Sequence, residues 1–140
     1  MLGFDMNRNY ATRNFTVLNN PRNYTGKKPF TAVESKSLSN FMLTVKESNK
    51  KSKIVVLDVH GWLDETIGDT HISKHYNKEF GNKNRTNALG SGYLITWAKE
   101  KLSADVSLIE FPWPKDSADI RRNDFSGKFT KATYNMLRSI

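Results

Sequence analysis

The chain has 140 residues, of which 37% are hydrophobic and 26% charged, so we expect a single domain over residues 1–140. The absence of cysteine excludes disulfides and thiolate chemistry. The formal net charge of +8 would suit an anionic partner such as nucleic acid or a polyanionic cell wall. Because the basic residues are scattered, we instead expect a solvated basic surface and no nucleic-acid partner. We expect no membrane span and no signal peptide, and the compartment stays open between cytoplasmic and secreted.

The first predicted helix covers residues 32–48. Thr31 and Glu34 have the spacing of a capping box, in which both side chains satisfy amides of the first turn. Apolar residues then recur at helical spacing and predict one buried stripe, formed by Leu38, Phe41, Met42 and Val45. Two further helices are expected at 91–102 and 125–138, the last packing through Phe129, Tyr134 and Leu137.

Two predicted strands end in polar residues. The stretch 54–59 is apolar except for Asp58, which favours a strand buried on both faces that delivers His60 at its carboxyl end. The second strand, 106–111, carries Glu110, a candidate general base because a partly buried carboxylate facing a cleft is suited to proton transfer. The alternative for His60 is a strand-end histidine that caps a neighbouring loop. The alternative for Glu110 is a carboxylate in a structural ion pair.

Strands alternating with helices predict an α/β fold with a mostly parallel or mixed sheet flanked by helices. Two strands are few for such a sheet. Either more strands lie within residues 11–20 and 61–89, which are polar and hard to read, or the sheet is incomplete.

Other candidate residues lie outside these strands. Asn7 and Arg8 could bind a carboxylate, although a surface turn is the simpler interpretation. His71 and His75 are four residues apart and would share a helical face. Ile72 stands where a zinc-protease helix carries its catalytic Glu, so we expect solvated histidines rather than a metal site.

Five segments resemble, in order, motifs of the carboxypeptidase A-type zinc metallocarboxypeptidases. They are the G-x-D-x-N-R-N-aromatic signature at 3–10, the Y-x-G…P-F-S-x-x-E pattern at 24–34, the strand ending in His60, the S-G-G-S-x-D-W helix start at 90–97, and the separation of 13 residues between Trp97 and Glu110.

The resemblance implies a role for each matching residue. His60 would ligate zinc. Asp58, two residues earlier on the same strand, could orient the imidazole, although residues two apart on a strand also simply share a face. Asn7 and Arg8 would bind the terminal carboxylate of a peptide. Glu110 would take a proton from zinc-bound water and pass it to the leaving amine.

The chain also departs from the family pattern. It contains no H-x-x-E motif, which supplies the other two zinc ligands, and it lacks a substrate-binding Arg of the family. We therefore expect the C-terminal half of a zinc-carboxypeptidase-like fold, with an incomplete zinc site and no activity by itself. Ala88 stands where many members have a substrate-capping tyrosine, and Tyr93 does not align with it. Ile95 falls at the specificity position and suggests an apolar terminal residue.

The leading hypothesis is a zinc-dependent metallocarboxypeptidase-type hydrolase that releases a C-terminal residue or trims peptidoglycan stem peptides. The alternative is a non-catalytic module that binds peptides or carboxylates on the same fold. Half of such a sheet would leave an exposed edge, so self-association is also expected.

Overall fold

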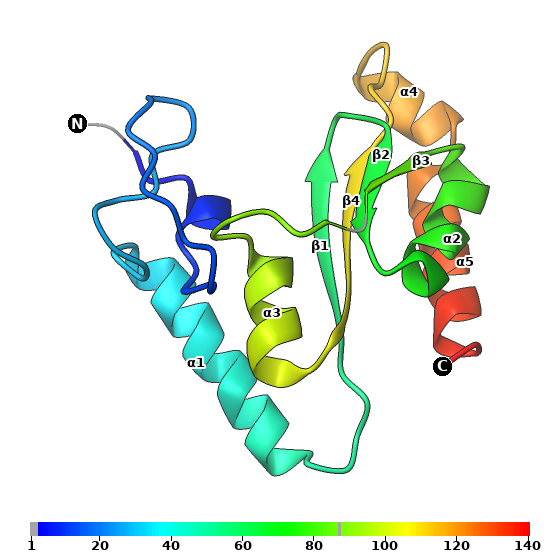
Figure 1. Cartoon of the computed structure of the whole chain (residues 1–140). Helices are drawn as coiled ribbons and strands as arrows, with labels where there is room; N and C mark the ends of the chain where they lie inside the picture. The colour runs from blue at the N-terminus through cyan, green and yellow to red at the C-terminus, as the bar shows by residue number, and fades with distance from the viewer. Residues whose placement is uncertain (1–2, 87) are drawn as a thin grey trace. The chain divides into compact units, whose positions relative to one another are not determined.

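Figure 1 shows the computed structural model of the chain, which describes residues 3–86 and 88–140. Its elements are a 3-10 turn η1 (Met6–Arg8), α1 (Val33–Ser48), β1 (Val55–Gly61), β2 (Glu65–Gly68), α2 (Thr70–Phe80), β3 (Lys83–Thr86), α3 (Leu94–Leu102), β4 (Asp105–Phe111), α4 (Ser117–Arg122) and α5 (Phe125–Leu137). None of the described helices is long and apolar enough to cross a membrane.

The chain forms two compact units. Unit 1 consists of residues 1–56 and 89–105, and unit 2 of residues 57–88 and 106–140. Each unit is therefore built from two separate stretches of sequence. The expectation that residues 1–140 behave as one domain stays a prediction.

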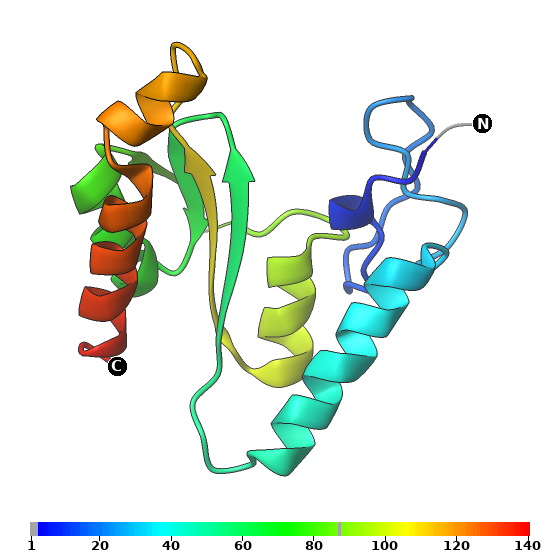
Figure 2. The ribbon, with the colours of Figure 1, turned by 180° about the vertical axis from the view of Figure 1, so that it is seen from behind.

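Most of the four-stranded sheet belongs to unit 2, in the order β1-β4-β2-β3. Strand β2 pairs in parallel with β3 and antiparallel with β4, where Glu65 lies opposite Glu110. The arrows of β1 and β4 lie side by side and point the same way (Figures 1 and 2). The sheet is thus mixed, and the predicted α/β class is confirmed.

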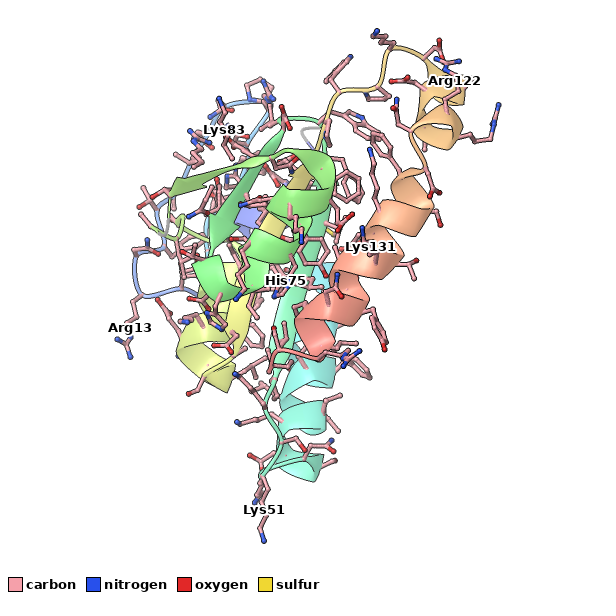
Figure 3. All side chains as sticks on the ribbon, turned by 90° about the vertical axis from the view of Figure 1, so that its right-hand side faces the viewer. Arg13, Lys51, His75, Lys83, Arg122 and Lys131 are labelled. Atoms are coloured by element: carbon pink, nitrogen blue, oxygen red, sulfur yellow. The ribbon has the colours of Figure 1, made fainter. Side chains whose placement is uncertain are left out.

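Helices α2 and α5 cover one face of this sheet. They lie side by side in Figure 3, with His75 on α2 and Lys131 on α5. Their packing centres on Tyr76 of α2, Ala132 of α5 and Ile109 of β4, each with no exposed surface. The odd-numbered side chains of β1 and β4 therefore face these helices, and the even-numbered ones point to the opposite face.

Strand β1 was expected to be buried on both faces, and this prediction is wrong. It lies at the end of the sheet, only Val56 is buried, and Val59 is 41% exposed. An apolar, β-branched run identifies a strand but does not reveal how many neighbours the strand has. Self-association through this edge stays a prediction.

The stretch 61–89 contains two strands and a helix that the sequence analysis did not assign. Strands β2 and β3 have four residues each, too few for a clear alternation. Helix α2 has a mostly polar sequence with a short apolar stripe, in which Ile72 and Tyr76 are completely buried. The other stretch considered for extra strands, residues 11–20, contains none.

All three predicted helices are present, but their packing faces were partly wrong. The buried residues of α1 are Ser35 and Ser39, whereas Phe41 of the apolar stripe is 64% exposed and Leu38 and Val45 are also exposed. A stripe shows which face can be buried, and nothing among the described residues buries this one.

The last helix shows a similar difference. Tyr134 and Leu137 of α5 are exposed, and the helix packs through Phe125, Ala132 and Met136 instead. Phe129 does join the core cluster, as expected. The small Ala132 permits the close approach of the neighbouring helix α2, which an analysis of large apolar residues overlooks.

The capping box predicted for α1 is absent, because the N-cap residue is Ala32 and the Thr31 hydroxyl donates to the Lys28 carbonyl. The buried side chain of Asn9 satisfies the helix start instead. Its Oδ1 accepts from Ala32 N–H at 2.9 Å and lies 2.8 Å from the Ser35 hydroxyl. Its Nδ2 donates to the Thr25 carbonyl at 2.5 Å.

Replacing Asn9 with Ala should therefore lower the free energy of unfolding by roughly 3 kcal/mol, because several buried polar groups lose their partner at once. Urea denaturation would measure the change. The control is Asn40→Ala, at an exposed position of α1, which should stay within about 0.5 kcal/mol of the unmodified chain. Equal stability of the two variants would contradict this role for Asn9.

Candidate functional site

The residues predicted to bind a carboxylate lie in unit 1, on the turn η1. Asp5 caps this turn by accepting from Asn7 N–H at 3.0 Å. The Asn7 side chain then reaches the first turn of α3, where its Oδ1 accepts from Leu94 N–H at 2.8 Å. Because Leu94 N–H needs an acceptor, this bond is made by Oδ1 of Asn7. The Nδ2 group of Asn7, with its two N–H donors, therefore points the other way.

Arg8 is held in a defined position beside Asn7. Its Nη1 donates to the Asn7 carbonyl at 2.8 Å, and its Cζ lies 4.0 Å above the centroid of the Tyr93 ring. Stacking on an aromatic ring engages the face of a guanidinium, whereas carboxylates bind its edge. The half-buried Arg8 can therefore stack and bind a carboxylate at the same time.

The loop before α3 is shaped to hold these two side chains. Gly92 has a φ of +70°, and a Cβ there would lie 2.2 Å from the Arg8 carbonyl oxygen, so only glycine fits. The Gly92 carbonyl accepts from Tyr10 N–H at 3.1 Å, and its N–H donates to the Thr12 hydroxyl at 2.9 Å. These hydrogen bonds hold the backbone of residues 3–10 against the start of α3. The helix begins at Leu94 instead of the predicted residue 91, because Gly92 has a left-handed backbone conformation.

Ile95, the expected specificity residue, lies in the first turn of α3 and is 0% exposed. Two residues on, Trp97 packs in an aromatic cluster with Tyr10 and Phe30, with ring centroids 6.0 and 6.4 Å away. Solvent therefore does not reach the Ile95 side chain. Its role in specificity stays a prediction.

The candidate zinc ligand lies in unit 2, near the end of β1. His60 Nε2 and Asp58 Oδ1 are 2.7 Å apart. An ionised carboxylate can only accept, so Nε2 carries a proton, and in a neutral imidazole Nδ1 is then the nitrogen of the metal-ligating type. The side chain of Asp58 is 13% exposed, which strengthens its hold on the imidazole. This is the contact expected between the two residues.

Glu110 and His60 occupy matching positions in neighbouring strands, each being one residue before the strand's end. Leu57 and Phe111 pack with Ile109 under α2 and α5, so alternation directs both His60 and Glu110 to the opposite face of the sheet. The structure thereby gives these two candidates a common face within unit 2.

Polar neighbours fix the surroundings of Glu110. Asn82 donates its Nδ2 to the Glu110 carbonyl at 2.7 Å, and the Oε2 atom of Glu110 is buried. Glu65 lies directly across on β2 and is compensated by Arg85, whose Nη1 is 3.0 Å from Glu65 Oε1. A second carboxylate is therefore close in register to the candidate base, with its charge balanced.

His71 and His75 lie on α2, as their spacing allowed. His75 Nε2 is 3.1 Å from the Ser139 hydroxyl, and partial burial, together with Lys74 and Lys78, lowers the pKa of His75 from its ordinary value. The neutral imidazole is favoured by these surroundings, but two histidines do not make a metal site.

The described residues do not fit a catalytic zinc ion on their own. Such a site needs three protein ligands. Within residues 3–86 and 88–140, no three His, Asp or Glu side chains gather closely enough to hold a metal. Only His60 is expected to ligate, so we derive no reaction step through a metal.

The candidates thus fall into two groups, with Asn7, Arg8 and Ile95 in unit 1 and His60 and Glu110 in unit 2. Sequence reasoning missed Tyr93, which it set aside for failing to align with a family tyrosine. A signal was nevertheless available, because Gly90 and Gly92 lie within the three residues before Tyr93, and glycines allow other groups to approach the backbone closely. It also missed Asn82, for which the sequence offers no signal.

Unit 2 also contains an apolar hollow of about 340 Å³ that includes none of these candidates. It is lined by Val59, Trp62, Phe111, Ile120, Phe125, Ser126 and Phe129.

Comparison with known proteins supports the fold. No family model matches the chain. It is 31% identical over 135 residues to bacteriocin BCN5 of Clostridium perfringens, covering 95% of this chain but 15% of the bacteriocin. Among solved structures, carboxypeptidase A of Helicoverpa armigera is similar at a TM-score of 0.72, with 14% identity, over 98% of this chain and 42% of that one. Murein-tripeptide amidase MpaA of Escherichia coli O157 matches at a TM-score of 0.62, with 19% identity, over 94% and 58%.

At these identities the solved structures show the fold alone, and the predicted carboxypeptidase-like α/β arrangement is confirmed. The chain spans about half the length of those structures and a small part of the bacteriocin.

The contact between Asp58 and His60 generates a prediction. Loss of the carboxylate in Asp58→Ala should lower the share of the Nε2–H tautomer, because the acceptor 2.7 Å from Nε2 is removed. Two-dimensional ¹H–¹⁵N NMR of the histidine rings above neutral pH would measure the tautomers. Glu47→Ala, which removes an exposed carboxylate on α1, should leave His60 unchanged. An unaltered tautomer in Asp58→Ala would refute the assignment.

Proposed function

We propose that this chain forms the carboxylate-binding and proton-transferring part of a carboxypeptidase-type peptide hydrolase. The observation that carries the proposal is the anchoring of both Asn7 and Arg8 to the start of α3. A directed amide and a stacked guanidinium are suited to the two oxygens of a peptide's C-terminal carboxylate. The carboxypeptidase-like fold agrees with that use.

Recognition of the carboxylate rests on charge and on prior ordering. Unit 1 has 12 Lys and Arg against 5 Asp and Glu, so it carries 12 − 5 = +7 of the total +8. This charge attracts an anionic end group over a distance. Arg8 is already held by Tyr93 and Asn7, so binding costs less side-chain entropy than at a mobile arginine.

Hydrolysis is assigned to Glu110. Its carboxylate would accept a proton from the attacking water and return it to the amine that leaves. His60, oriented by Asp58, would be one ligand of the zinc ion. Because the described residues do not complete that site, we propose that the chain by itself is inactive and that further ligands come from elsewhere.

For the substrate, the names of two similar proteins point toward bacteria. One is a bacteriocin and the other a murein-tripeptide amidase, and murein is the peptide-bearing polymer of bacterial walls. Peptidoglycan stem peptides are therefore proposed as substrates beside ordinary peptides. Both end in a carboxylate, so the Arg8 site serves either.

The second candidate function is a non-catalytic module that binds peptide carboxylates without metal. It is favoured by the absence of a three-residue metal cluster within the described ranges. Both candidates use Asn7 and Arg8, and they differ in whether His60 and Glu110 have a chemical role.

The carboxylate site can be tested on the chain itself. The chain should bind N-acetyl-alanyl-alanine but not its C-terminal amide, because only the acid offers two charged acceptors. Arg8→Gln should weaken binding at least about tenfold, in line with the worth of a charge-assisted hydrogen bond. Calorimetry or NMR titration would measure this. Arg13→Gln, at an exposed arginine of the same unit, is the matched control. Equal binding of acid and amide would overturn the proposed site.

Catalysis requires a longer form of the protein that supplies an H-x-x-E segment. In that form, Glu110→Gln should lower kcat/KM by roughly 10²–10⁴-fold, the usual contribution of a general base. A peptidase assay with and without chelator would measure it, and Glu47→Gln serves as a control at an exposed carboxylate. A loss of less than tenfold would remove Glu110 from the mechanism. Binding without hydrolysis, unaffected by chelator, would support the binding module.

A further inference from the structure

We infer that Tyr93 determines specificity at the carboxylate site, restricting it to peptides whose last residue is small. This inference rests on the proposed role of Arg8. Tyr93 is the N-cap residue of α3, and its ring lies against the Arg8 guanidinium at 4.0 Å. Tyr93 therefore lies directly against the guanidinium to which a C-terminal carboxylate would bind.

The position of the ring is fixed from several sides. The backbone around it is held by the Asn7–Leu94 bond of 2.8 Å and by the Tyr10–Gly92 bond of 3.1 Å. The ring also rests on the backbone of Gly90, where a Cβ would lie 2.5 Å from the Tyr93 Cε1 atom. Glycine at 90 is therefore needed for the ring to occupy this position.

This placement limits the room beside Arg8. A carboxylate bound to the guanidinium edge lies in the plane of the fork, and the Tyr93 ring is stacked on that plane. The side chain next to the carboxylate must therefore lie near the ring. Ile95, beyond it on α3, is 0% exposed, so solvent does not reach past the ring to this side chain. On this inference a methyl group next to the carboxylate is accommodated beside the ring, whereas a large side chain would have to displace Tyr93.

Displacement carries a cost in binding. Moving the ring separates it from the guanidinium, so Arg8 loses both the cation–π contact and its ordering. Tyr93 is thus a positioning residue for Arg8 as well as a wall of the site. The two roles predict different effects of removing the ring. Loss of the positioning role weakens the binding of every carboxylate to a similar extent, whereas loss of the wall changes only the binding of ligands with a large last side chain.

The test compares two probes, N-acetylalanine and N-acetylphenylalanine, by NMR titration of the full chain. The unmodified chain should bind the phenylalanine derivative about tenfold more weakly, a typical penalty for overpacking by one large side chain. Tyr93→Phe keeps the ring and should reproduce this preference. Tyr93→Ala should bind N-acetylalanine several-fold more weakly and discriminate less than about twofold between the probes.

Gly90→Ala provides an independent variant, because its Cβ pushes the ring away without removing it. It should share the lost discrimination of Tyr93→Ala. Circular dichroism would confirm that each variant is folded. If Tyr93→Ala and Gly90→Ala discriminate as the unmodified chain does, the inference fails while the carboxylate site stands. If Arg8→Gln binds N-acetylalanine unchanged, or the unmodified chain binds neither probe, the proposed function itself fails.

Discussion

The buried amide of Asn9 connects the parts of unit 1 that are far apart in sequence. It bonds to the loop at Thr25 and to the start of α1 at Ala32, and the Asn9 carbonyl accepts from Phe30 N–H at 2.8 Å. The turn that precedes Asn9, with Asn7 and Arg8, is therefore held in place by the hydrogen bonds of Asn9. An irregular N-terminal segment becomes a rigid support because one side chain satisfies backbone groups that no helix or sheet would satisfy.

The sequence predicted what local patterns determine and missed what tertiary contacts determine. The apolar run at 54–59 and the strand at 106–111 identified β1 and β4, and helical spacing located α1, α3 and α5. Strand β2 was missed because its four residues are recognisable only through their pairing with β4. The capping prediction at Thr31 was wrong because the Asn9 side chain, 23 residues before Ala32 in sequence, accepts from the Ala32 N–H at the start of the helix.

For the candidate site, the motif identified residues but not their surroundings. Asn7 and Arg8 were found through the resemblance, yet their anchoring depends on the backbone of Leu94 and on the ring of Tyr93, which no motif assigns. The pairing of His60 with Asp58 was predictable, since residues two apart on a strand share a face. The position of Asn82 behind Glu110 was not, because it depends on how β3 follows α2.

The interleaving of the two units has a consequence for synthesis. Unit 1 needs α3, which lies in the sequence between the two stretches of unit 2, after residues 57–88 and before residues 106–140. A growing chain can therefore complete unit 1 only after residue 105 is available, and unit 2 only at the end. Each unit therefore has to join two stretches that are separated in sequence by part of the other unit, and such long-range contacts slow folding. No single cut in the sequence separates the two units, because each contributes two stretches that alternate with those of the other.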